Sequence, residues 1–129
     1  MNPPDLSRFD DCGMRPWSGS VEALKPAAAH AHLRHAAVDL GKARDRATLF
    51  GELDAELALP EHFGHNWDAL ADVLEDRDWL GKRGIVITLR HAQQYQREHP
   101  TDWKTLEDLF TEACDYWRER HVPFWVFVA

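Results

Sequence analysis

The chain has 129 residues, 44% of them hydrophobic and 29% charged, and a formal net charge of −7 at pH 7. These values fit one globular domain that needs no disulfide or metal for stability, and the excess of acid opposes binding to nucleic acid phosphates. No apolar run reaches the roughly 20 residues of a membrane span, and the start of the chain lacks the features of a secretion signal, so we expect a cytoplasmic protein.

The first third of the sequence predicts an arm, a short helix and a strand. Residues 1–20 combine Pro, Gly, Ser and Asp without periodicity, which indicates an extended arm that Trp17 orders in part. The alanine-rich residues 25–35 are typical of a short helix. The apolar run at residues 35–41, closed by a glycine, favours a strand.

Two amphipathic helices are expected next. Residues 45–60 favour the first, with Asp45 able to cap its start and Pro60 placed to end it. Its buried stripe repeats every four residues: Leu49, Leu53 and Leu57. Residues 67–80 favour the second, with Asn66 as its cap. Its buried stripe consists of Trp67, Leu70 and Leu74.

The last third predicts two further strands around two helices. Residues 84–90 are apolar and β-rich, which indicates a strand. Residues 91–100 favour a short, weak helix, and residues 101–120 a long helix capped by Thr101. Residues 123–129 are apolar throughout, as is typical of a strand buried on both faces.

The order of these elements predicts the fold class. Strands separated by helical crossovers pair in parallel, with right-handed connections. We therefore predict an α/β fold in residues 34–129, a three-stranded parallel sheet with helices packed against it. Residues 1–33 form an N-terminal extension in this prediction. Cys12 and Cys114 lack the spacing of metal ligands and are expected to remain unpaired thiols.

The acidic charge is concentrated in one segment. Residues 50–78 contain nine acids and a single base, Arg77, so this segment carries −8 and the remainder of the chain +1. Such a segment repels phosphate and attracts a basic protein surface. The alternative is a solvated acidic face that only aids solubility.

Several side chains in this segment could instead bind a metal or perform catalysis. The potential ligands are His62, His65, Asp68 and Asp72. The two histidines flank Gly64 in a loop, however, and the sequence has no HExxH or paired-cysteine motif. Acid–base hydrolysis of RNA would need cations for the phosphate, and the segment offers one arginine. The histidines at positions 30, 32 and 35 are spread over a helix and its exit and are expected to face solvent.

An interaction surface is the third interpretation of this segment. If the apolar stripe of residues 67–80 faces inward, Asp68 and Asp72 face outward, one helical turn apart. Like charges at this spacing repel by about 0.2–0.5 kcal/mol, and a cationic partner would reverse that sign. In the preceding loop Gly64 permits a tight backbone path, while His62 and Phe63 place rings beside the acidic helix. This shape suits a basic, anion-binding cleft.

The stretch LALPEHFGHNWDALADVL resembles the signature of the barstar family, the intracellular inhibitors of barnase-type ribonucleases. In that family a helix ends at proline, an aromatic-Gly-x-Asn loop follows, and a second helix begins with an apolar-Asp-Ala-Leu-x-Asp pattern. The resemblance covers about residues 35–129. It implies the family fold, a three-stranded parallel sheet with packed helices, and therefore agrees with the pattern-based prediction.

The resemblance also implies a function and a set of site residues. Family members block the ribonuclease active site with the loop and second helix, whose acids take the place of substrate phosphate. Asp72 matches the main phosphate-mimicking acid and Asp68 the second. The other matched contact positions are Asn66, Gly64, His62 and, at the periphery, Glu112. We expect a monomeric immunity protein, not an enzyme, that needs no cofactor and binds a basic barnase-like ribonuclease or related toxin.

Some features depart from the family pattern. His62 stands where the best-known member has a tyrosine, and Ala71 replaces a bulky aromatic residue. The N-terminal extension has no counterpart. These departures leave open a barstar-like module for a non-nuclease partner, beside the metal-dependent enzyme considered above.

Overall fold

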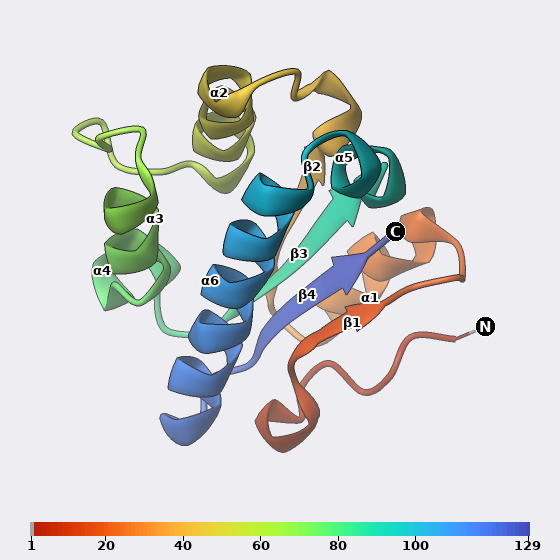
Figure 1. The fold of residues 1–129 in the computed structure, drawn as a ribbon. Coiled ribbons are helices and arrows are strands. Elements are labelled where there is room, and N and C mark those ends of the chain that lie inside the picture. Colours follow the sequence, from red (N-terminus) through yellow and green to blue (C-terminus); the bar gives the residue numbers. More distant parts are fainter. Residues whose placement is uncertain (1) are drawn as a thin grey trace.

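The core of the fold is a four-stranded parallel sheet in the order β1–β4–β3–β2 (Figure 1). The computed structural model describes residues 2–129. The strands are β1 (Met14–Pro16), β2 (Arg34–Asp39), β3 (Ile85–Arg90) and β4 (Phe124–Val128). The three longer strands confirm the predicted parallel α/β arrangement, because each lies in a region where the sequence favoured a strand.

The fourth strand, β1, corrects the prediction of a three-stranded sheet. It pairs with β4 at the edge of the sheet, where the Val126 N–H donates to the Gly13 carbonyl at 3.2 Å and the Trp17 N–H to the Val128 carbonyl at 2.9 Å. Pro16 lacks an N–H, which an edge strand tolerates. Three residues that include a proline show no alternating pattern, so this strand depends on the partner edge and not on local sequence.

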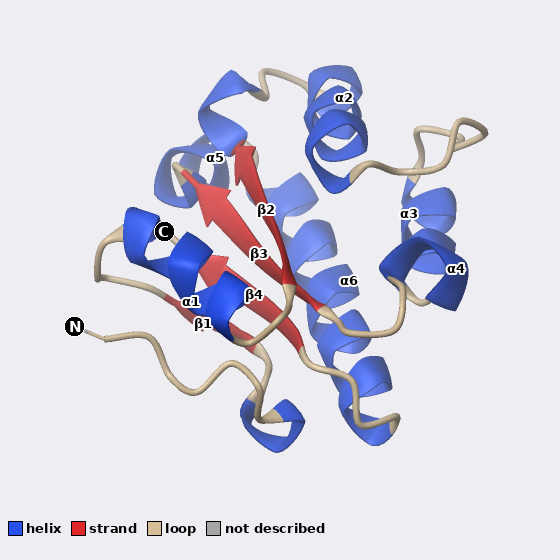
Figure 2. Ribbon diagram, turned by 180° about the vertical axis from the view of Figure 1, so that it is seen from behind, coloured by secondary structure: helices blue, strands red, loops and turns tan. Residues whose placement is uncertain are grey.

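The helices cover both faces of the sheet. They are α1 (Leu24–His30), α2 (Arg46–Leu57), α3 (Trp67–Leu74), α4 (Arg77–Leu80), α5 (Ala92–Glu98) and α6 (Pro100–Glu119). Short 3-10 helices lie at Phe9–Asp11, Val21–Ala23 and Leu40–Lys42. The long helix α6 crosses one face, and α1 lies on the opposite face (Figures 1 and 2). Within residues 2–129, no helix combines the length and apolar character needed to cross a bilayer.

The two central strands are buried on both faces because their alternate residues enter different cores. The core beneath α2, α3 and α6 includes Ile85, Ile87, Leu89, Phe124 and Val126. The core beneath α1 and the N-terminal arm includes Val86, Trp125 and Phe127, together with Leu6, Trp17 and Leu24. The arm is therefore ordered by more than Trp17, since Leu6 and Cys12 also belong to this core.

The helix predicted over residues 67–80 is interrupted after Leu74. The Asp76 carboxylate accepts a hydrogen bond from the Asp78 N–H at 2.9 Å, which caps the separate helix α4. Aspartate at this position competes with continuation of the helix, because its side chain satisfies a backbone donor at a new N-terminus. The prediction of one continuous helix was wrong at this point.

The ends of two other helices also differ from expectation. Helix α2 begins after Asp45, whose side chain forms the predicted cap with the Thr48 N–H at 2.8 Å. It ends at Leu57, ahead of Pro60, because Ala58 adopts a left-handed conformation with φ of 51°. Helix α6 begins at Pro100, so Thr101 lies inside the helix and is not its cap.

The arm is attached to the sheet through Trp125. Its indole N–H donates to the Leu6 carbonyl at 2.8 Å, and the ring is fully buried. We expect Trp125→Phe to lower the free energy of unfolding by about 2–4 kcal/mol, because it removes ring volume and leaves a buried carbonyl unpaired. Denaturant unfolding monitored by circular dichroism measures this loss. A denaturant midpoint equal to that of the wild type would show that the contact between Trp125 and Leu6 contributes nothing to stability.

Candidate functional site

The loop between α2 and α3 extends away from the sheet (Figure 1) and is anchored by aromatic side chains. Phe63 is buried and packs edge-on against Phe50 of α2, with ring centroids 6.1 Å apart. Trp67, at the start of α3, packs against the same ring at 4.9 Å. These contacts hold the loop against α2, so the aromatic residues are structural anchors and the polar residues between them are left at the surface.

Asn66 joins the loop to α3. Its Oδ1 accepts a hydrogen bond from the Ala69 N–H at 2.8 Å, which is the predicted cap, and its Nδ2 donates to the Gly64 carbonyl at 3.0 Å. A Cβ added at Gly64 would lie 3.0 Å from that Nδ2, so Gly64 leaves room for the capping amide. Next to Gly64 the left-handed residue is His65, with φ of 49°, and not Gly64 itself. The tight turn that we expected at Gly64 is therefore made by the backbone of His65.

We expect Asn66→Ala to destabilise α3. Loss of the cap should lower the free energy of unfolding by about 1 kcal/mol, whereas Asn66→Asp retains an acceptor for the Ala69 N–H and should cost less. Urea unfolding of the two variants gives the comparison. Equal stability of the alanine variant and the wild type would contradict the assigned capping role.

Helix α3 presents its acids on the face opposite its buried stripe. Leu70 and Leu74 are fully buried, while Asp68 and Asp72 are exposed, as the sequence predicted. A hollow of about 190 Å³ separates this helix from the loop. The residues that line it include His62, Gly64, Ala69, Asp72 and Asp76. Asp72 thus lies where the loop and helix together form a concave surface.

The acidic face continues from α3 onto α6. The Trp117 indole of α6 donates to the Leu74 carbonyl at 2.7 Å, which fixes the two helices side by side. Burial raises the pKa of Glu75, the nearby Glu112 carboxylate raises it further with a smaller effect from Asp72, and Arg120 opposes the increase. Glu112 therefore shares a surface with α3. Glu75 follows the last residue of α3, and its three-residue spacing from Asp72 in the sequence could have added it to the site.

The four side chains considered as metal ligands do not form one cluster. His65 Nε2 lies 3.0 Å from Asp54 Oδ2 on α2, and its ring packs against Phe63. His62 is exposed at the rim of the hollow. In residues 2–129 no group of three or more His, Cys, Asp or Glu side chains is arranged to hold a metal ion. The geometry thus gives no support to the set His62, His65, Asp68 and Asp72 as metal ligands.

Several histidines occupy positions where the backbone is left-handed. Left-handed φ values occur at His32, His65, His91 and His121. Histidine is enriched among non-glycine residues that adopt this conformation. His35, in contrast, lies in β2, half-buried, with its Nε2 3.3 Å from the Thr88 hydroxyl. The expectation of solvent exposure holds for His30 and His32 and is wrong for His35.

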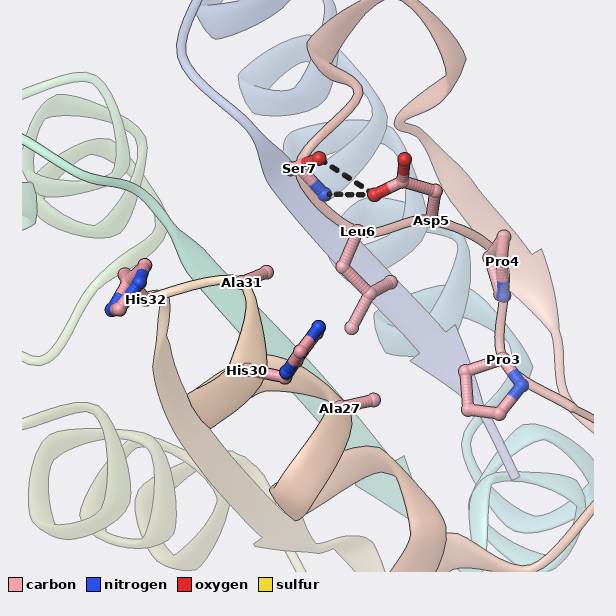
Figure 3. A pocket seen from close by; sticks show the side chains of 9 residues that line it. All are labelled: Pro3, Pro4, Asp5, Leu6, Ser7, Ala27, His30, Ala31 and His32. Carbon is pink, nitrogen blue, oxygen red and sulfur yellow. Dashed lines mark hydrogen bonds between the residues drawn. The ribbon is translucent and has the colours of Figure 1, made fainter.

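A larger hollow, of about 500 Å³, lies between the N-terminal arm and α1 (Figure 3). It is lined by Pro3, Pro4, Asp5, Leu6 and Ser7 from the arm and by Ala27, His30, Ala31 and His32 from the helix region. One Asp5 carboxylate oxygen is occupied by the Ser7 N–H and hydroxyl, and His32 lies on the far side of the hollow from it (Figure 3). The polar groups that line this larger hollow do not point toward one position. We therefore place the candidate site at the loop and α3.

Comparison with known proteins points to one family. The sequence model of the family described as Barstar (barnase inhibitor) matches residues 33–129. The match includes the three longer strands, the loop and α3, and it begins after β1 and α1. A search of curated protein sequences returns no match.

Proposed function

The chain belongs to the barstar family, and from this membership we propose that it inhibits a barnase-type ribonuclease by inserting the loop and α3 into the enzyme's active-site cleft. The observation that carries this proposal is the position of Asp72, which is exposed beside a concave surface and forms no ion pair with residues 2–129. Arg or Lys side chains that normally bind RNA phosphate would supply that cation. The cationic side chains of a phosphate-binding cleft form charge-assisted hydrogen bonds with carboxylates as well as with phosphates.

The carboxylates of the acidic face form no ion pair with the described residues of the free protein. Across the described residues, no Lys, Arg or His nitrogen lies within 4.0 Å of a carboxylate of this face. The carboxylates concerned are those of Asp68, Asp72, Glu75, Asp76 and Glu112. Several acids elsewhere do form ion pairs, as in Arg46–Asp102 at 2.9 Å and Lys104–Asp108 at 2.9 Å. Unpaired acids gathered on one face favour a cationic partner and would steer its approach.

Each site residue then has a role in the complex. Asp72 is the central phosphate mimic and Asp68 the second. Asn66 and Gly64 hold the loop against α3, and His62 contributes to the rim. Glu112 provides a peripheral acidic contact from α6. We further propose that the protein acts as a cytoplasmic monomer, binds the nuclease one to one without a cofactor and serves as its immunity protein.

A titration of ribonuclease activity tests the proposal. The protein is added in steps to a barnase-type ribonuclease, and RNA cleavage is followed. We expect activity to fall linearly and to vanish near one equivalent, and the effect to weaken as salt is raised, because charge steers association. Undiminished cleavage at several equivalents would contradict the proposed function and favour a non-nuclease partner.

The raised pKa of Glu75 gives the complex a pH dependence. A nuclease cation beside Glu75 favours the ionised carboxylate, so the pKa should fall on binding and the complex should hold fewer protons than the free protein. Affinity should therefore rise as pH increases through the raised pKa of Glu75, above the ordinary value of 4.5. One proton limits the change to at most about tenfold per pH unit.

The measurement compares the wild type with Glu75→Gln by calorimetry over acidic to neutral pH. The nuclease's own titrations affect both proteins equally, so the ratio of the two dissociation constants isolates Glu75. A ratio that does not change with pH would show that Glu75 meets no cation in the complex.

A further inference from the structure

The loop of the proposed site is connected to α2 at both of its ends by a single residue, Asp54. The Asp54 carbonyl accepts hydrogen bonds from the N–H groups of Ala58 and Leu59, the latter at 3.2 Å. The Asp54 carboxylate lies 3.0 Å from His65 Nε2, at the far end of the loop. The backbone of Asp54 therefore holds the start of the loop, and its side chain holds the end.

The conformation of His65 is what brings its ring to Asp54. With φ of 49°, the residue is left-handed, and its ring packs on Phe63 with centroids 5.1 Å apart. Phe63 is in turn buried against α2. His65 thus contacts both an anchor of the loop and the helix behind it. It is followed directly by Asn66, whose side chain caps α3.

We propose that His65 and Asp54 are positioning residues, which hold the loop in the shape that binds the nuclease. This inference rests on the proposed function, since the loop is the rim of that site. Neither side chain lines the hollow beside Asp72, so neither needs to touch the partner. Their contribution is to restrict the loop before binding, which reduces the ordering cost of association.

The variants that test the proposal separate loss of the His65–Asp54 contact from a change in backbone conformation and from a change in net charge. His65→Asn retains a residue that tolerates the left-handed conformation but cannot reach Asp54 in the same way. Asp54→Asn keeps the main-chain carbonyl and the side-chain size. Glu56→Gln is the matched control, because it removes one acid from the exposed surface of the same helix without an ion-pair partner among the described residues.

The first measurement uses the free protein. Amide hydrogen exchange in residues 61–66 should be about two- to fivefold faster in His65→Asn and in Asp54→Asn, as expected for loss of a half-exposed polar contact. The Glu56→Gln control should exchange like the wild type. The denaturant midpoints of the two loop variants should fall by no more than this small change in loop opening implies, and the midpoint of the control should be unchanged, which excludes a larger role in overall stability.

The second measurement follows binding to a barnase-type ribonuclease by rapid mixing. Both single variants should dissociate about two- to fivefold faster, and the double variant should dissociate no faster than either, because one contact is lost in each case. Glu56→Gln should change the association rate alone.

The results have distinct meanings. Unchanged loop exchange in both single variants, or effects that add in the double variant, would overturn the positioning role. A wild-type protein that does not inhibit the ribonuclease would contradict the proposed function, and the exchange measurement would still decide whether His65 and Asp54 hold the loop.

Discussion

Replacing Asp72 with alanine is expected to raise the dissociation constant of the nuclease complex by at least about thirtyfold. In the complex this carboxylate would lie in a desolvated cleft against cationic side chains. Removing one partner of such a buried charge pair typically costs about 2–5 kcal/mol, since the other charge is left unpaired. At 1.4 kcal/mol for each factor of ten, the lower end of that range corresponds to about thirtyfold.

The same substitution should not harm the free protein. Asp72 is exposed in the last turn of α3, where an acid interacts unfavourably with the helix macrodipole. We therefore expect Asp72→Ala to leave the free energy of unfolding unchanged or to raise it by a few tenths of a kcal/mol. Glu56→Ala serves as a control that removes equal charge from an exposed site on α2. Equal dissociation constants for Asp72→Ala and the wild type would refute the central role of Asp72.

Gly84→Ala is expected to destabilise the fold more than any surface change. Gly84 precedes β3 with φ of 107°, and an added Cβ would lie 2.1 Å from the main-chain oxygen of Pro123. That oxygen also accepts the Ile85 N–H at 3.1 Å, and the Gly84 carbonyl accepts the Arg34 N–H at 3.2 Å. Relief of the clash would shift the starts of β2, β3 and β4. Backbone strain and overpacking together should cost about 3–5 kcal/mol.

Gly51→Ala is the matched control for this prediction. Gly51 lies within α2, exposed, and a Cβ there would meet no atom within 4 Å. This change should raise the free energy of unfolding by about 0.5–1 kcal/mol, because alanine favours the helix. Guanidinium unfolding of both variants measures the contrast. Wild-type stability of Gly84→Ala would show that the strand junction adapts freely.

Local sequence patterns predicted the elements that depend on local chemistry. The predicted caps Asp45 and Asn66 and the apolar stripes of α2 and α3 correspond to real helices. The break at Asp76 was missed because an aspartate inside an amphipathic pattern can either stay in the helix or start a new one. The strand β1 was missed because its pairing with β4 joins residues more than 100 positions apart.

The candidate site was predictable in part. The exposed acids of α3 followed from the inward stripe, whereas Glu112 entered only through the family resemblance, since its proximity to α3 depends on how α6 packs. The role of His65 could not be inferred from sequence. Its contact with Asp54 requires the left-handed turn, and it is the loop conformation that brings the two side chains together.

Competition for the nuclease cleft tests the central claim most directly. A nucleotide that occupies the phosphate-binding cleft of a barnase-type ribonuclease is added at increasing concentration while binding of this protein is measured by calorimetry. If the acidic face of α3 takes the place of phosphate, the apparent dissociation constant will rise linearly with nucleotide concentration. Simultaneous binding of nucleotide and protein, each with undiminished affinity, would contradict it.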